Sequence, residues 1–203
     1  MNTHIRKTVL ASLFAALIAV GAYIVIPVGP VPITLQTLFI LTAGILGGRR
    51  IGVSAVVIYL IAGAVGLPVF SGGTGSIAHF IGPTGGYLIA SLPAVFVCGT
   101  FSELGTRLEL AFGTGRTATP QGTIAKTAML TMGSLLASIL FYLIGVPWLK
   151  VVLGLQWNAA MQAGLIPFVI GDILKLIASV IIGTLFGRRI HLFLNPESAN
   201  EPA

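Results

Sequence analysis

Residues 167–176 read PFVIGDILKL and open the last long hydrophobic segment of the chain. Asp172 and Lys175 lie three residues apart in this segment, and Asp172 is the only one of the five acidic residues that stands inside a long apolar run. A charged side chain at membrane depth costs about 2.5–3.5 kcal/mol on insertion scales. Such residues usually mark functional sites, so the pair is the first candidate site, although the two charges could also serve only to hold helices together.

The composition around this segment is that of a membrane protein. Of the 203 residues, 56% are hydrophobic and only 8% are charged, whereas an average soluble domain is about 25% charged. At about 20 residues per spanning helix, the length suits about six spans in a single membrane domain. The net charge of +6 comes from basic residues at the ends of apolar runs, so no nucleic acid partner is expected. The predicted fold class is an all-α polytopic membrane protein in a lipid bilayer.

Six apolar segments are predicted to span the membrane, at residues 8–26, 33–46, 51–67, 87–101, 123–145 and 167–186. Prolines and glycines at 27–32 break the chain after the first segment. A polar cytoplasmic linker is expected at 103–122, and a flexible polar tail at 195–203.

The basic residues predict the orientation of these spans. With the N-terminus in the cytoplasm, nine of them fall on the cytoplasmic side and only Lys150 falls outside. Both termini are therefore expected in the cytoplasm. Asp172 and Lys175 then lie roughly 7 and 12 Å below the outer end of the last span, at about 1.5 Å per residue.

The glycine- and proline-rich loops after the first and third spans share this outer side. Irregular backbone at membrane depth is tolerated only where it is buried in protein or lines a cavity, so a cavity open to the outside is expected. The loop 71–86, SGGTGSIAHFIGPTGG, could contact a ligand there or only cap the bundle. His79 in this loop is a lone histidine, typical of a packing residue, and no metal site is predicted.

Other candidate residues surround the same expected cavity. Thr34 and Gln36 are polar residues at the outer end of the second span, where each could bind a solute or another helix. Tyr87 begins the fourth span and could stack on a ligand or anchor the helix at the interface. Asp172 can accept from an N–H group, and Lys175 can donate to a carbonyl or a carboxylate. A small solute that carries both kinds of group would fit them.

Ala11, Ala15 and Ala19 form a stripe of small residues on the first span. Such a stripe lets another helix approach closely. It indicates either internal packing or a docking surface for a separate membrane subunit.

Four stretches together resemble the BioY family, the biotin-binding membrane subunits (S components) of energy-coupling-factor (ECF) transporters. They are VPITLQTL at 31–38, GLPVFSGG at 66–73, GPTGGYL at 82–88 and PFVIGDILK at 167–175. The resemblance implies an ECF S-component-like fold that captures biotin from the outer face of the bacterial cytoplasmic membrane. It also implies two kinds of partner, a transmembrane coupling subunit and a pair of cytoplasmic ABC-type ATPases.

The same resemblance implies roles for individual residues. Asp172 and Lys175 match the charged pair of the binding site, Gly72 and Gly73 together with residues 82–87 match its capping loop, and the alanine stripe matches an A-x-x-x-A docking motif. Whether Lys175 serves the ureido group or the carboxylate of biotin stays open. No cofactor is expected, and ATP would act only through the partner ATPases, since the chain has no Gly-Lys dipeptide for a phosphate-binding loop.

Two other classes of function are weighed against this one. A self-sufficient ion-coupled carrier would often show an inverted repeat, and none is convincing here. An intramembrane enzyme would need a nucleophile with a base, yet Ser134, Ser138 and Cys98 have no histidine in the predicted spans beside them. The chain is therefore not expected to be an enzyme.

Overall fold

The computed structural model describes residues 3–112 and 119–194 of the chain. Five long helices form the bundle: α1 (Thr3–Tyr23), α2 (Gln36–Ala64), α3 (Gly85–Phe112), α4 (Pro120–Leu153) and α6 (Val169–Leu194). The shorter elements are β1 (Val25–Ile26), β2 (Ile33–Thr34), the 3₁₀ helix η1 (Ile77–Phe80) and α5 (Trp157–Gly164). The chain is a mostly helical, multi-pass membrane protein, as predicted.

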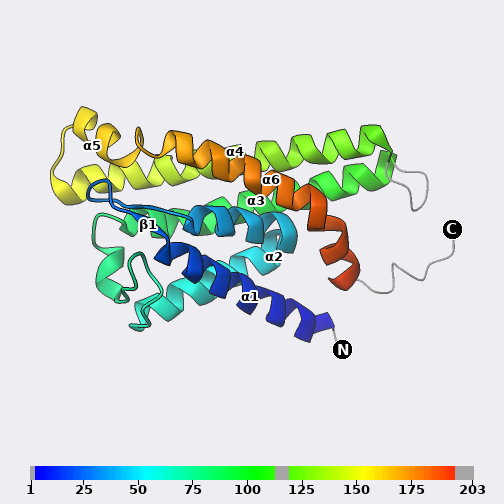
Figure 1. Cartoon of the computed structure of the whole chain (residues 1–203), viewed down its shortest axis with the longest axis horizontal. Coiled ribbons are helices and arrows are strands. Elements are labelled where there is room, and N and C mark those ends of the chain that lie inside the picture. The colour runs from blue at the N-terminus through cyan, green and yellow to red at the C-terminus, as the bar shows by residue number, and fades with distance from the viewer. Residues whose placement is uncertain (1–2, 113–118, 195–203) are drawn as a thin grey trace.

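The bundle has two distinct ends (Figure 1). β1, α5 and the loop that carries η1 gather at one end, at the left of the view, and the first residues of α1 and the last residues of α6 lie at the other. An even number of spans is expected to bring the two ends of the helical bundle together in this way. By the charge asymmetry of the sequence, the end with α5 is the outer one.

α2 consists of two antiparallel helical segments, residues 36–47 and 49–64. They meet at Gly48, whose φ of 68° and ψ of −177° are not helical. A Cβ at Gly52 would lie 3.1 Å from the Cα of Gly44, whereas eight residues of straight helix span about 12 Å. The described residues contain five helices long and apolar enough to cross a membrane, and with α2 counted as two segments they provide six spans, which confirms the six-span prediction.

The turn of α2 is held by Glu103 of α3. The Arg49 backbone N–H donates to Glu103 Oε1 at 3.0 Å, and the Arg49 Nε lies 3.4 Å from Oε2. The carboxylate therefore satisfies a free N–H at the start of segment 49–64 and lies near its positive dipole end.

The polar linker predicted at 103–122 is largely wrong. Residues 103–112 continue α3, residues 120–122 begin α4, and 113–118 lie outside the described residues. The reason is that the acidic residues are used within the bundle: Glu103 binds Arg49, and Glu109 lies 2.7 Å from Lys126 of α4. Polar side chains paired in this way do not end a helix.

Several predicted helix ends also shift. The first span ends at Tyr23 and the second begins at Gln36, because residues 25–26 and 33–34 pair as antiparallel strands. The third ends at Ala64, and α6 covers residues 169–194 rather than 167–186. α4 runs past the predicted end at 145 to Leu153. Pro147 lies inside it and does not end the helix, because proline is tolerated within membrane helices. The tail at 195–203 lies outside the described residues.

Replacing Gly48 by alanine is expected to lower the free energy of unfolding more than replacing Gly154. Both glycines have positive φ, 68° and 63°, but a Cβ at Gly48 would lie 2.8 Å from Glu103 Oε1, and none of the described atoms lies within 4 Å of one at Gly154. The φ and ψ of Gly48 also belong to a region adopted almost only by glycine. We expect losses of about 1 kcal/mol for Gly154→Ala and about 3 kcal/mol for Gly48→Ala.

The measurement is denaturant-induced unfolding of the purified variants in mixed detergent micelles. If both variants lose the same free energy of unfolding, the positive φ alone accounts for the destabilisation, and the packing of the α2 turn contributes nothing.

Candidate functional site

A cavity of about 350 Å³ lies at the outer end of the bundle. Its wall is built from the 30–37 segment, the loop between α2 and α3, the first residues of α3, and the facing parts of α4 and α6. This volume falls in the usual range for pockets that bind small molecules. The structure therefore contains the predicted cavity, and this cavity is the candidate ligand-binding site.

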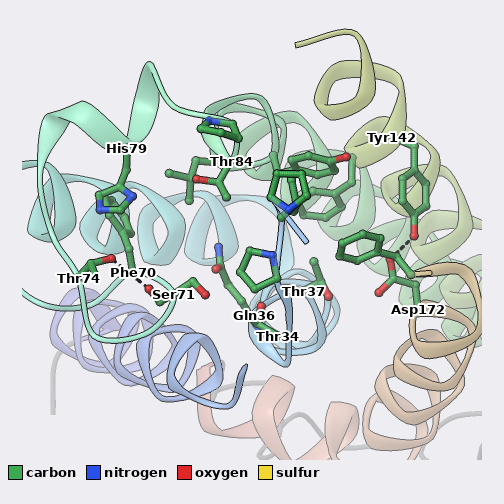
Figure 2. A pocket seen from close by; sticks show the side chains of 18 of the residues that line it. Thr34, Gln36, Thr37, Phe70, Ser71, Thr74, His79, Thr84, Tyr142 and Asp172 are labelled. Carbon is green, nitrogen blue, oxygen red and sulfur yellow. Dashed lines mark hydrogen bonds between the residues drawn. The ribbon is translucent and has the colours of Figure 1, made fainter. Parts of the chain in front are cut away.

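Four polar side chains form a connected network at one end of the cavity, where Figure 2 shows Tyr142 and Asp172 facing each other. The Lys175 Nζ lies 2.8 Å from Asp172 Oδ1 and donates to Thr37 Oγ1 at 3.1 Å. The Tyr142 hydroxyl donates to Asp172 Oδ2. The side chains of Lys175 and Asp172 are only 8% and 17% exposed. The network thus joins α2, α4 and α6 at a level where an unpaired charge would be costly.

The network retains unused hydrogen-bonding capacity. A lysine ammonium has three N–H donors, and two of those on Lys175 are taken by Asp172 and Thr37. Each carboxylate oxygen of Asp172 accepts one bond in the network and has a further lone pair. Asp172 also stands in the first turn of α6, where the helix dipole favours a negative charge. The site offers a donor and acceptors side by side.

The depth of the site follows from the length of segment 36–47. Twelve residues of helix span about 18 Å, and the hydrocarbon core is about 30 Å thick. A segment that starts from the cytoplasmic side therefore ends roughly 12 Å below the outer edge of the core. Thr37 lies at this end and contacts Lys175, which agrees with the depth predicted for Lys175 from α6.

Aromatic rings form much of the remaining wall, from Phe70, Tyr87, Phe141 and Phe168. Phe70 is only 2% exposed, and its ring packs edge-on against His79 with the centroids 5.5 Å apart. The Tyr87 hydroxyl donates to the Gly164 carbonyl at 2.7 Å, at the end of α5. This bond occupies the Tyr87 hydroxyl proton, so the main contribution of Tyr87 to the cavity is its ring.

Gly72 and Gly73 form a turn at the edge of the cavity. Both have φ of 73°, and the Gly72 N–H donates to the Ala22 carbonyl at 3.3 Å. Neither glycine is on the cavity wall, but Ser71 and Thr74 on either side of them are. Figure 2 shows Ser71, Thr74 and His79 at the end opposite Tyr142 and Asp172. The two glycines therefore contribute to the cavity indirectly: their turn places Ser71 and Thr74 on the cavity wall.

The structure brings five of the seven sequence-predicted binding residues onto one wall: Thr34, Gln36, Tyr87, Asp172 and Lys175. Sequence reasoning missed others, including Tyr142, Thr37, Phe70 and Phe168. It named the loop 71–86 as a possible ligand contact but did not single out Thr74 and Thr84 within it. A hydroxyl within a spanning segment was the available signal for Tyr142. His79, expected as a packing residue, contacts Phe70 and also lines the cavity.

The alanine stripe of α1 faces the interior of the protein. Ala11 and Ala15 are 3% and 7% exposed, and Ala19 is partly buried. In this conformation the stripe is covered by the chain's own helices. The exposed face of α1 at the same level carries two other small residues, Ser12 and Ala16.

The remaining candidates for catalysis lie away from the cavity. Cys98 and Ser134 are buried in the middle of the bundle, with Sγ and Oγ 3.8 Å apart. In residues 3–112 and 119–194, no three His, Cys, Asp or Glu residues are placed to hold a metal ion.

Comparison with known proteins gives a consistent result. The model of the BioY family matches residues 1–191. The chain is 40% identical to a probable biotin transporter BioY of Pyrococcus horikoshii, covering 87% of this chain and 93% of that protein. It is 37% identical to the biotin transporter BioY2 of Lactococcus lactis, covering 90% of each. The crystal structure of the S component for biotin from an ECF-type ABC transporter matches with a TM-score of 0.76 and 28% identity, over 93% of this chain and 95% of that chain.

Proposed function

This chain belongs to the BioY family, and from that premise we propose that it is the substrate-binding membrane subunit of a biotin uptake system. It takes biotin into the outer cavity and delivers it through an ATP-driven ECF complex. The observation that carries the proposal is the cavity with the Asp172, Lys175, Thr37 and Tyr142 network at one end and aromatic walls.

Biotin combines the groups that such a cavity accommodates. Its ureido group has two N–H donors beside one carbonyl acceptor, its fused thioether ring is apolar, and its tail ends in a carboxylate. Phe70, Phe141 and Phe168 provide apolar contact for the rings. The chemistry of the wall thus fits a compact solute with two polar ends.

The geometry favours the ureido group as the partner of Asp172 and Lys175. A ureido group needs an acceptor and a donor next to each other, and the ion pair offers both. A carboxylate needs donors only and would be repelled by Asp172. We therefore assign the carboxylate to the opposite end of the cavity, near Ser71, Thr74 and His79.

The Asp172→Asn variant is expected to bind biotin at least about tenfold more weakly, because the amide loses the negative charge that strengthens a hydrogen bond to a ureido N–H. The measurement is calorimetric titration of the purified protein in detergent. Glu103→Gln is the matched control, since it removes a carboxylate at the opposite end of the bundle. Unchanged affinity in the Asp172→Asn protein would refute the site assignment.

Biotin methyl ester separates the two possible roles of Lys175. If Lys175 binds the ureido group, Lys175→Met weakens binding of biotin and of its ester by the same factor, within about twofold. The reason is that the substitution and the esterification then act at opposite ends of the ligand, so their effects on the binding free energy are additive. If Lys175 instead binds the carboxylate, the difference in affinity between biotin and the ester disappears in the variant. Thr37→Val, which removes one partner of Lys175 without leaving a buried charge, provides the second variant.

The proposal includes partners, because the relatives of this chain are named as transporters and its sequence has no Gly-Lys dipeptide for a phosphate-binding loop. A transmembrane coupling subunit and a pair of ABC-type ATPases would supply the energy. The complex would sit in the bacterial cytoplasmic membrane, with the biotin cavity facing outward. We assign the contact with the coupling subunit to α1, on its exposed face at Ser12 and Ala16, since Ala11 and Ala15 are buried.

Ala16→Trp is expected to reduce ATP-driven biotin uptake in vesicles at least about tenfold while biotin binding by the isolated subunit stays unchanged, because a bulky residue prevents close helix approach. Ala159→Trp, at an exposed position of α5, is the control that should change neither uptake nor biotin binding.

Ala15→Trp should impair folding in addition to uptake, since Ala15 is buried. Normal uptake by Ala16→Trp would contradict the docking face, and ion-driven uptake by this chain alone would favour a self-sufficient carrier instead.

A further inference from the structure

A second cavity, of about 270 Å³, lies at the opposite end of the bundle from the biotin cavity. It is enclosed by the turn of α2, by α3, by the first part of α4 and by the last part of α6. The charge asymmetry of the sequence puts this end at the cytoplasmic side of the membrane. Its location and residues are independent of the proposed biotin site.

A buried cation lies in the wall of this cavity. Lys126 is only 7% exposed, and its ammonium donates to Glu109 Oε2 at 2.7 Å. The other two N–H groups of the ammonium are available for a further acceptor. A cation this deeply buried is costly to retain unless it is well paired.

The charges around the cavity do not cancel. Glu103 pairs with Arg49 and Glu109 pairs with Lys126, so both carboxylates near the cavity are neutralised. Arg107 also lines the cavity, and in the described part of the chain it takes part in no ion pair. His191 lines it from α6. Among the described residues that line the cavity, Arg107 is therefore the positive charge that no carboxylate pairs with.

Five apolar side chains also line the cavity: Ile45, Leu46, Leu110, Leu130 and Leu194. The hydroxyls of Ser102 and Thr106 line it too, and each donates to a backbone carbonyl. A free inorganic anion would gain no binding free energy from contact with these apolar side chains. An amphiphile with one negative charge and a hydrocarbon chain would use both parts of the wall. A phospholipid whose only net charge is its phosphate diester has this chemistry, and basic pockets between helices on the cytoplasmic side suit such head groups.

We propose that this cavity binds one anionic phospholipid of the cytoplasmic leaflet, with its phosphate at Arg107 and Lys126 and an acyl chain against the leucines. The lipid fills the space between α2, α3, α4 and α6 at the turn that Glu103 holds.

Native mass spectrometry of the purified protein tests this proposal. Wild type is incubated with dioleoyl phosphatidylglycerol or with dioleoyl phosphatidylcholine, and the bound fraction of each lipid is measured. We expect selective retention of phosphatidylglycerol and about a fivefold loss of it in Arg107→Gln, as one basic residue near a membrane surface contributes about 1 kcal/mol. Arg189→Gln, an exposed basic position on α6 outside the cavity wall, should retain wild-type binding.

A second variant removes the buried pair without leaving a lone charge. Lys126→Met combined with Glu109→Gln should also lower phosphatidylglycerol binding, and its unfolding midpoint reports whether the fold is intact. Equal losses in Arg107→Gln and Arg189→Gln would overturn the proposal, because they would indicate diffuse surface charge. Equal binding of the two lipids, or displacement of phosphatidylglycerol by millimolar inorganic phosphate, would also overturn it.

Discussion

The ion pair of Asp172 and Lys175 is the interaction on which the outer half of the bundle depends. Either charge alone would be costly at this depth, and α6 provides both, 2.8 Å apart. The pair still needs further partners, and Thr37 of α2 and Tyr142 of α4 provide them. Three helices are thereby fixed at one level. Because segment 36–47 ends at that level, the space above it has to be closed by loops, and this is where the cavity lies.

The cytoplasmic half uses the same principle with different residues. Glu103 of α3 caps the returning segment of α2, and Lys126 of α4 pairs with Glu109 of α3. Between these two polar levels the helices meet through small and apolar residues, with Ser91 and Ser134 fully buried. Close packing there leaves little room for rearrangement. Each end of the bundle therefore holds its own cavity around its own charges, separated by a tightly packed middle.

The sequence was informative wherever a residue conflicted with its surroundings. A charge in an apolar run is visible without a structure, so Asp172 and Lys175 could be predicted to lie in the outer cavity, which they line. Runs of apolar residues between basic ends predicted the six spans. Phe70 and Phe168 could not be distinguished from ordinary lipid-facing residues, because their role comes from the loops that fold back on them. The α1 stripe shows a further limit. Ala11 and Ser12 both begin small-residue stripes, and only packing against α2 decides which one is buried.

The polar network also bears on how a ligand gains affinity. If the charged groups had to separate before biotin entered, the cost of breaking a buried pair would be subtracted from the binding energy. Asp172 is already held by Lys175 and Tyr142, and it still has acceptor capacity directed by their bonds. A ureido group can therefore add hydrogen bonds to a network that stays intact. Such a site would be preorganised: under the proposed assignment, the groups that pair with one another in this structure are the same groups that would orient the ligand.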